Sequence, residues 1–513
     1  MKPSQLIFPL LSLVCGAISV LAQAPYNLWL CMLVGMSVYY ALFARVQTAK
    51  SAFACGWLFG FGYFGGGLWW IANALLVPGN DFRWVWPFAI AGLPAVCAFF
   101  PAFASLACYR YADRKKIAGY IMFAASFALS EWLRGHVFSG FPWNMYGYIW
   151  SIFLPIVQIA ALGGSYFLTL ATLFWVTLPG FLAVWQASRK QQAALVSLAV
   201  AIFIAGSWYG HMRIESVSPG YWPDLQIRIV QPNIPQEDKW DPDKARANLK
   251  RMLDLSSPPP SRPESPTTLI IWPETALEFN VLEYDAAREM IRNMMSKYKN
   301  NVFLLTGLLR FEMDKNGKRH YFNSLAVLDR DLNIRAVYNK SHLVPFGEYI
   351  PLQDYIPMHP FVQFQGFASG NGPETLTVEG APPFSALICY EVIFPHAVVG
   401  KDRPAWLVNV TNDAWYGDSP GPRQHFAQVR FRAIEEGLPV VRSAETGISG
   451  VIDPFGRIVY FAKLNAMAVK NVMLPKPLPQ TPYSRFGDLL FFGCTLACLL
   501  TALKPRFTKR SNT

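Results

Sequence analysis

The segment LIIWPE, residues 269–274, is the clearest sign of how the middle of the chain folds. Four apolar residues in a row favour a buried strand, Pro273 ends it, and Glu274 follows at the edge of the sheet. Similar short apolar runs recur between residues 220 and 485, separated by stretches with helical character, and this alternation predicts a layered α/β fold. The predicted strands are 225–231, 268–272, 302–306, 324–328, 384–389, 406–410 and 439–442, and the predicted helices are 242–255, 284–298 and 423–436.

Two other predicted strand ends carry polar side chains. The run VYNK ends at Lys340 and is followed by HLVPFGEY, which contains Glu348. The run ALICYE leads into Cys389 and Glu391. Because α/β folds assemble their sites at the carboxyl ends of strands, we expect these side chains to lie near Glu274.

A carboxylate, an ammonium and a thiol form a coherent catalytic set. A thiol with an ordinary pKa of ~8.5 is only a few per cent thiolate at neutral pH, so it needs help to act as a nucleophile. A carboxylate such as Glu274 can accept the thiol proton of Cys389, and an ammonium such as Lys340 can stabilise the thiolate and an oxyanion. Taken singly each residue is weak evidence, because charged residues after strands are most often solvated loop ends.

Cysteine usage singles out one thiol. The chain has eight cysteines, and Cys389 is the only one between residues 220 and 485. The other seven lie in long apolar runs, where a cysteine is most often a small buried hydrophobe. Cys389 has no disulfide partner within its own part of the chain, so it is either a buried core thiol or a free nucleophile.

Long apolar runs fill roughly the first 210 residues and a short C-terminal stretch. Several approach the ~20 residues that cross a hydrocarbon core of ~30 Å, which predicts a multi-pass α-helical membrane domain of about eight spans. The expected organisation is a membrane domain of seven helices at 1–211, the α/β domain at 220–480, a last membrane helix at 487–504 and a basic tail at 505–513. The runs are 6–21, 28–43, 52–75, 86–108, 117–133, 161–185, 193–208 and 489–503.

The net charge of +12 reflects membrane orientation, and no nucleic-acid partner is expected. Basic residues gather in alternate loops, whereas the opposite short loops carry only Arg83 and Arg134, so the positive-inside rule places both termini in the cytoplasm and the α/β domain outside. A cleaved signal peptide ending near residues 22–24 is an alternative that leaves the later orientation unchanged. The whole net charge comes from the basic residues of these loops and tails, less the one acidic residue among them, Asp113. The basic residues are Lys2, Arg45, Lys50, Arg110, Arg114, Lys115, Lys116, Arg189, Lys190, Lys504, Arg506, Lys509 and Arg510.

Together, WPE, the lysine followed by HLVPFGEY, and ICYE resemble the motifs of the nitrilase superfamily. The resemblance implies an αββα sandwich with Glu274, Lys340 and Cys389 as its catalytic residues and Glu348 beside them. It implies no metal or nucleotide cofactor. The seven histidines form no spacing typical of a metal site, which agrees with that expectation.

Spans on both sides of such a domain make the whole chain similar to the apolipoprotein N-acyltransferases of Gram-negative bacteria. The resemblance implies a multi-pass enzyme of the bacterial inner membrane with a periplasmic catalytic domain. Cys389 is then expected to take an acyl chain from a phospholipid, phosphatidylethanolamine at its sn-1 position, as a thioester. The acyl chain passes to the α-amino group of the diacylglyceryl-cysteine of an apolipoprotein. Further matching segments are 60–65, 131–134, 140–143, 231–236, 239–240 and 412–417.

The resemblance also assigns roles around these three residues. Glu274 is the general base, and Lys340 supports the thiolate and the oxyanion. Glu348 orients either Lys340 or Glu274. Glu391 positions the site or the incoming amine. Four aromatic residues next to the motifs are expected to contact the acyl chain or headgroup or to act as a gate, with ordinary packing as the alternative: Trp240, Tyr390, Trp415 and Tyr416.

Several alternatives remain open at this stage. Water in place of the amine gives a membrane-bound amidase or lipid hydrolase. A transporter with an external binding domain is a non-enzymatic alternative, disfavoured because the spans show no duplicated pattern. Glu131 and Arg134 are either functional or a structural pair. Residues 359–369 are either a membrane-dipping arm or a packed loop.

Overall fold

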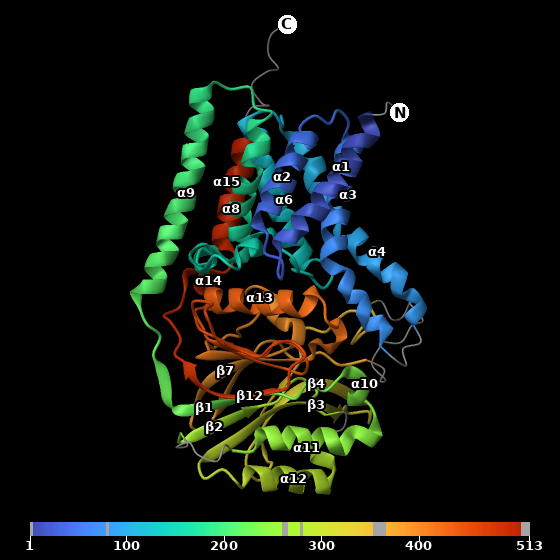
Figure 1. Ribbon diagram of the computed structural model, residues 1–513, viewed down its shortest axis with the longest axis vertical. Coiled ribbons are helices and arrows are strands. Elements are labelled where there is room, and N and C mark those ends of the chain that lie inside the picture. Colours follow the sequence, from blue (N-terminus) through green and yellow to red (C-terminus); the bar gives the residue numbers. More distant parts are fainter. Residues whose placement is uncertain (1–3, 78–81, 259–264, 278–280, 352–365, 504–513) are drawn as a thin grey trace.

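The computed structural model describes residues 4–77, 82–258, 265–277, 281–351 and 366–503. These residues form a bundle of helices and an α/β sandwich, joined by the chain on both sides of the sandwich (Figure 1). The chain enters the sandwich after α9 (Arg189–Ser216) and returns to the bundle through α14 (Pro482–Phe486) and α15 (Leu489–Leu503). The start of α1 (Ser4–Ser19) and the end of α15 lie at the far side of the bundle from the sandwich (Figure 1).

The bundle is held by close backbone contacts and stacked aromatic rings. A Cβ added at Gly62 would lie 2.2 Å from the carbonyl oxygen of Leu13, so glycine is needed where α1 and α3 cross. The rings of Phe123 and Phe127 stack with centroids 4.2 Å apart in the centre. The remaining helices are α1 (Ser4–Ser19), α2 (Trp29–Phe43), α3 (Ala49–Leu68), α4 (Trp86–Cys97), α5 (Phe99–Tyr111), α6 (Ile117–His136), α7 (Leu154–Val157) and α8 (Ala160–Leu182), with 3-10 helices η1 (Val20–Ala22), η2 (Trp69–Leu76), η3 (Arg83–Val85) and η4 (Tyr146–Trp150).

Apolar composition and length single out three segments of the described chain that are able to cross a membrane: Arg83–Tyr111, Ala160–Leu182 and Arg189–Ser216. Shorter apolar helices cover Ile7–Ala22, Trp29–Phe43 and Leu489–Leu503. α9 lies at the edge of the bundle, where Phe203 packs against Trp150, and it exposes apolar side chains along its length, such as Leu198 and Ile204 (Figure 1). Apolar helices are thus present, but fewer segments meet the length and composition of a span than the eight expected.

Glu131 and Arg134 form a buried ion pair inside the bundle. Arg134 Nη2 lies 2.8 Å from Glu131 Oε2, and both side chains are almost wholly buried. The guanidinium also donates to the carbonyl oxygen of Phe141, in the loop that leads back toward the sandwich. The contacts of this pair are those of a structural element that fixes the loop after α6.

The sandwich contains two six-stranded sheets, and the predicted α/β fold is confirmed. One sheet has the order β12-β1-β2-β3-β4-β5 and the other β11-β10-β9-β8-β7-β6. Strands β1, β2 and β3 run parallel, as do β7, β8 and β9. The strands are β1 (Tyr221–Gln231), β2 (Thr267–Ile271), β3 (Asn301–Met313), β4 (Arg319–Leu328), β5 (Ile334–Asn339), β6 (Thr375–Val378), β7 (Ala381–Ile388), β8 (Trp406–Thr411), β9 (Val440–Ala444), β10 (Gly450–Ile452), β11 (Ile458–Phe461) and β12 (Ala468–Pro475).

Helices cover the outer faces of the two sheets. α11 (Ala245–Ser256) and α12 (Asp285–Met295) lie on the side away from the bundle, and α13 (Pro420–Glu436) lies between the second sheet and the bundle (Figure 1). The apolar residues Ala287, Ile291 and Met294 of α12 recur at helical spacing and are buried. Short helices α10 (Gln236–Lys239), η5 (Pro242–Lys244), η6 (Val281–Glu283), η7 (Cys389–Ile393) and η8 (Asp413–Tyr416) occupy the connections.

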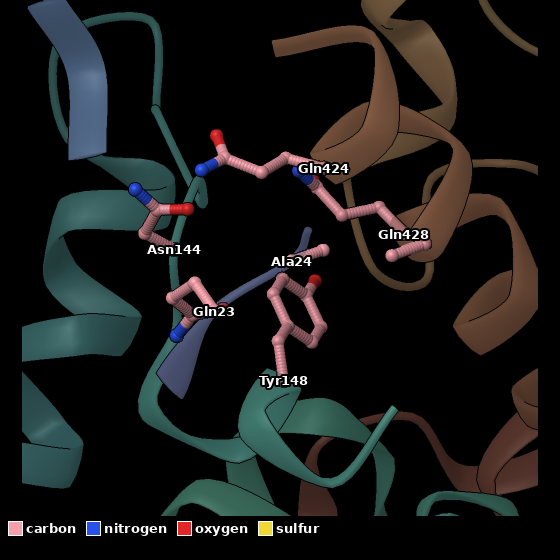
Figure 2. A pocket seen from close by; sticks show the side chains of 7 residues that line it. Gln23, Ala24, Asn144, Tyr148, Gln424 and Gln428 are labelled. Carbon is pink, nitrogen blue, oxygen red and sulfur yellow. The ribbon is translucent and has the colours of Figure 1, made fainter. Parts of the chain in front are cut away.

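Polar contacts join α13 to the bundle. Ser165 donates from its backbone N–H to Glu435 Oε1 over 2.8 Å, and Arg432 Nη2 donates to Ser165 Oγ over 2.9 Å. Further along α13, a cavity of about 10 Å³ lies between Gln428 and Asn144 of the bundle. Figure 2 shows the side chains around it. The second sheet is therefore bound to the bundle along the length of one helix.

Candidate active site

Three strand ends bring the predicted catalytic residues together. Glu274 follows β2, Lys340 follows β5 and Cys389 follows β7. Lys340 Nζ lies 3.6 Å from Glu274 Oε1, and the charges of both residues act on the Cys389 thiol. All three side chains are buried where the two sheets meet. The carboxylate, ammonium and thiol, far apart in sequence, thus form one cluster.

Neutral and backbone donors hold the Glu274 carboxylate. Asn323 Nδ2 donates to Oε1 over 2.8 Å, and the backbone N–H of Asn412 donates to Oε2 over 2.8 Å. Asn323 comes from β4, and its amide also reaches Glu348 Oε1 at 3.2 Å. The carboxylate is therefore fixed on both oxygens and directed toward Lys340.

Lys340 lies between two carboxylates. Its ammonium is 2.9 Å from Glu348 Oε1 and is only 1% exposed. Burial by itself lowers the pKa of Lys340, but the charges of Glu348 and Glu274 outweigh it and hold the pKa well above its ordinary value. Glu348 in turn accepts the backbone N–H of Val344 over 2.8 Å. Lys340 therefore remains a cation, as an electrostatic catalyst requires.

Cys389 occupies a tight turn at the start of η7. Its φ of 55° lies in the left-handed region, which is uncommon for a residue with a side chain and is often found at functional sites. Burial, followed by the charge of Glu274, raises the pKa of the thiol to about 12, while Lys340 opposes the shift. The resting thiol is therefore protonated, and a base would be needed for it to act as a nucleophile.

A buried polar network lies behind Cys389. Asn409 Nδ2 donates to the carbonyl oxygen of Cys389 over 3.1 Å, and Arg442 donates to Asn409 Oδ1. Arg442 Nη2 also donates to Asp413 Oδ2 over 2.7 Å, and His425 Nδ1 lies 3.0 Å from Asp413 Oδ1. Burial alone raises the pKa of Asp413, but Arg442 and His425 hold it below its ordinary value. The network fixes the backbone of the thiol-bearing turn.

Sequence reasoning did not assign this network. Asp413 lies in one of the segments that carry the resemblance but has no predicted role, and the sequence assigns no role to His425. Asn409 and Arg442 lie within predicted strands, where a polar residue looks ordinary. A usable signal is the acidic residue Asp413, three residues after the predicted strand at 406–410, a pattern similar to the one that marks Glu274.

Glu391 and Tyr390 hold neighbouring backbone. Glu391 Oε1 accepts the hydroxyl of Tyr338 over 2.8 Å and the backbone N–H of Ser341 over 2.8 Å, and Oε2 accepts the N–H of Ile388 over 2.7 Å. Tyr390 donates to the carbonyl oxygen of Leu343 over 2.7 Å. Both contacts tie the turn of Cys389 to the loop after Lys340.

The remaining aromatic residues lie at different places. Tyr416 packs against Trp70 of the bundle, with ring centroids 4.6 Å apart, and its carbonyl oxygen accepts from Asn73 over 2.9 Å. Trp415 is half-buried beside it. Trp240 follows α10 and is 39% exposed. Tyr416 therefore belongs to the junction with the bundle, whereas Trp240 presents its ring at the surface.

Part of one predicted segment and the whole of another lie outside the residues that the structure describes. Residues 359–365 of the predicted arm and the basic tail at 505–513 lie outside the described residues. Within the described ranges, no three His, Cys, Asp or Glu side chains are arranged to hold a metal ion.

Two family models match the chain. Residues 15–178 match the apolipoprotein N-acyltransferase N-terminal domain, and residues 226–472 match the carbon-nitrogen hydrolase model. An apolipoprotein N-acyltransferase of Rhodopseudomonas palustris is 37% identical, with 93% of this chain and 91% of that protein aligned. One from Bradyrhizobium diazoefficiens is 38% identical, with 98% and 95% aligned. One from Caulobacter vibrioides is 35% identical, with 98% and 96% aligned.

Proposed function

The chain belongs to the apolipoprotein N-acyltransferase family and is an acyltransferase of lipoprotein biosynthesis, and from this premise we propose that it carries the acyl group on Cys389. The observation that supports the proposal best is the cluster of Glu274, Lys340 and Cys389 at three strand ends. A transporter has no use for this cluster, so the non-enzymatic alternative is set aside.

In the first half-reaction, the sulfur of Cys389 attacks the sn-1 ester carbonyl of a phospholipid, phosphatidylethanolamine. The thiol proton moves to the carboxylate of Glu274, and the carbonyl oxygen becomes an oxyanion beside the Lys340 ammonium. The carbon–oxygen bond of the ester then breaks. The departing lysophospholipid oxygen takes the proton from Glu274, which leaves a thioester on Cys389.

In the second half-reaction, the α-amino group of the diacylglyceryl-cysteine of an apolipoprotein attacks the thioester. Glu274 accepts a proton from the amine, the carbon–sulfur bond breaks, and the thiolate of Cys389 recovers that proton. The product is an amide, and the enzyme returns to its starting state. No metal or nucleotide takes part.

The other predicted residues support these steps in different ways. The short contact of Glu348 with Lys340 suits the role of orienting the ammonium. The donors around Glu391 suit a role in positioning the loop after Lys340 more than contact with the incoming amine, because they already occupy both of its oxygens. Tyr390 acts with it. Trp240, Trp415 and Tyr416 are proposed to contact the lipid substrates or gate their access.

We place the enzyme in the bacterial inner membrane with eight spans and both termini in the cytoplasm. The proposed organisation is a membrane domain at 1–211, a periplasmic catalytic domain at 220–480, a last span at 487–504 and a cytoplasmic tail at 505–513. The alternating basic loops and the exposed apolar side chains of α9 support it. A tethered domain reacts at the lipid surface, which avoids about 0.8 kcal/mol for each methylene of an acyl chain moved into water.

Intact-protein mass spectrometry tests the proposal. The purified protein is incubated with phosphatidylethanolamine, and we expect a mass increase of one acyl chain that is absent from Cys389→Ser. Adding an apolipoprotein-like peptide with a diacylglyceryl-cysteine should then discharge the adduct and acylate the peptide. Release of free fatty acid without peptide acylation would indicate a hydrolase instead. An adduct that persists in Cys389→Ser would refute the role of this thiol.

A further inference from the structure

A second buried ammonium contacts the backbone of Glu274, whereas Lys340 contacts its carboxylate. Lys239, the last residue of α10, is 1% exposed. Its Nζ lies 3.2 Å from the carbonyl oxygen of Glu274 and 3.3 Å from Thr275 Oγ1. Lys239 therefore contacts the backbone of the proposed base and leaves the carboxylate to its other partners.

The backbone at this point is one that needs support. Thr275 has a φ of 39°, in the left-handed region, which is costly for a β-branched residue. The other side of the same turn is pressed against Gly307, where an added Cβ would lie 2.5 Å from the Thr275 nitrogen. A buried cation on the carbonyl oxygen and hydroxyl of this turn supplies contacts that hold it in place.

The cation has its own counter-charge. Lys239 Nζ lies 3.5 Å from Glu445 Oε2, and both side chains are almost wholly buried. Glu445 directly follows β9 of the second sheet, and its backbone N–H donates to Thr411 over 3.1 Å. The pair thus links the turn after β2 in the first sheet to the strands of the second sheet, which carry Cys389.

The segment that carries Lys239 is bound to the site at a second point. Gln236, at the start of α10, accepts from Asn412 Nδ2 over 2.8 Å, and the backbone N–H of Asn412 donates to Glu274 Oε2. α10 therefore touches both the backbone of Glu274 and the residue that fixes its carboxylate. Trp240 follows directly, so the same anchor places its ring.

We propose that Lys239, paired with Glu445, is a positioning residue that holds the Glu274–Thr275 peptide so that the Glu274 carboxylate faces Lys340 and Cys389. The inference rests on the proposed function, because it assigns Lys239 to the base used there. Lys239 touches no reacting atom. Its loss should therefore act through the geometry of Glu274 and leave the thiol itself in place.

The test replaces both members of the pair, because one buried charge left alone is strongly destabilising. Lys239→Met with Glu445→Gln keeps the approximate size of both side chains and removes both charges. The rate of acyl-adduct formation with phosphatidylethanolamine is measured by intact mass, together with its pH profile and the thermal midpoint. We expect adduct formation about 10²-fold slower, since a displacement of about 1 Å has an effect of this size. The rate should also rise more steeply with pH, because a displaced base leaves the reaction to the free thiolate.

Two further variants keep the test decisive. Thr275→Val removes only the hydroxyl acceptor, and the loss of one hydrogen bond should slow adduct formation about fivefold even if the double variant does not fold. Lys244→Met is the matched control, because Lys244 is a half-exposed lysine of the next turn that pairs with Asp238 and does not contact Glu274. It should react at the unaltered rate.

The outcomes separate the two proposals. A folded double variant that reacts at the unaltered rate with an unaltered pH profile would overturn the role of Lys239 and leave the thioester mechanism intact. If the double variant does not fold, an unaltered rate in Thr275→Val overturns it in the same way. Absence of an adduct in the unaltered protein would instead refute the proposed function.

Discussion

Replacing Glu274 by glutamine isolates the proton transfer on which the mechanism depends. The thiol pKa of about 12 means that at pH 7 the thiolate fraction of Cys389 is on the order of 10⁻⁵, since each pKa unit is a factor of ten. In the proposed mechanism the unaltered enzyme avoids this penalty, because Glu274 takes the proton as the sulfur attacks. Glutamine retains the size of the side chain but cannot accept that proton.

The expected loss is about 10²- to 10⁴-fold in the rate of adduct formation, the range that a positioned general base contributes. The lower part of the range is favoured for a specific reason. The charge of Glu274 itself raises the pKa of the thiol, so its removal increases the thiolate fraction and partly offsets the loss. The variant should also show a rate that rises about tenfold for each pH unit between pH 7 and 9, because only the thiolate then reacts.

Time-resolved intact mass spectrometry with phosphatidylethanolamine measures both quantities. Glu289→Gln is the matched control, because Glu289 lies on α12 and its exposed carboxylate is outside the site. It should not change the rate. A Glu274→Gln variant that acylates as fast as the unaltered protein, with the same pH profile, would show that the thiol loses its proton elsewhere.

Two other variants probe the surroundings of the site. Gly307→Ala places a Cβ 2.6 Å from the Cα of Glu274, so the base must move, and we expect adduct formation about 10²-fold slower by intact mass. Gly220→Ala is the control and should have no effect, because its Cβ would make only an ordinary contact with Lys476 at 3.6 Å. An unaltered rate in Gly307→Ala would contradict the required contact. Burial, followed by the charge of Arg442, lowers the pKa of His425, so the folded state binds fewer protons than the unfolded state just below pH 6.5, and stability should fall as the pH drops through that range. His425→Gln removes this contribution, so its thermal midpoint should fall less between pH 8 and pH 5 than that of the unaltered protein; an equal fall in both would show that His425 is not its source.

Apolar runs made much of the sandwich predictable. The predicted strands at 268–272 and 406–410 match β2 and β8, whose residues are all buried and therefore read as continuous hydrophobic segments. β11 and β12 were missed because their side chains are largely exposed, and β12 finds its partner β1 only through the tertiary fold. α13 was expected at residue 423, but it begins at Pro420, because proline is well tolerated in the first turn of a helix.

The residues of the site likewise fall into those that a local sequence pattern predicts and those that it does not. Glu274, Lys340 and Cys389 were predictable because each ends a strand and their order is characteristic. Asn323, Asn409 and Lys239 were not assigned, because a polar side chain in a strand or a short helix carries no mark of what it will contact. Their contacts arise from packing between segments distant in sequence, which no local pattern encodes.

The position of α13 has a consequence for dividing the molecule. One end of the helix presents His425 to the network that supports the thiol-bearing turn, and the other end binds Ser165 of the bundle through Arg432 and Glu435. A soluble fragment cut out of the middle of the chain would expose that face to water and lose those partners. The α/β sandwich therefore depends on its own helical bundle and is not an independent unit. If the sandwich were fused to a different set of membrane helices, α13 would have to be redesigned, because it contacts both the sandwich and its own bundle.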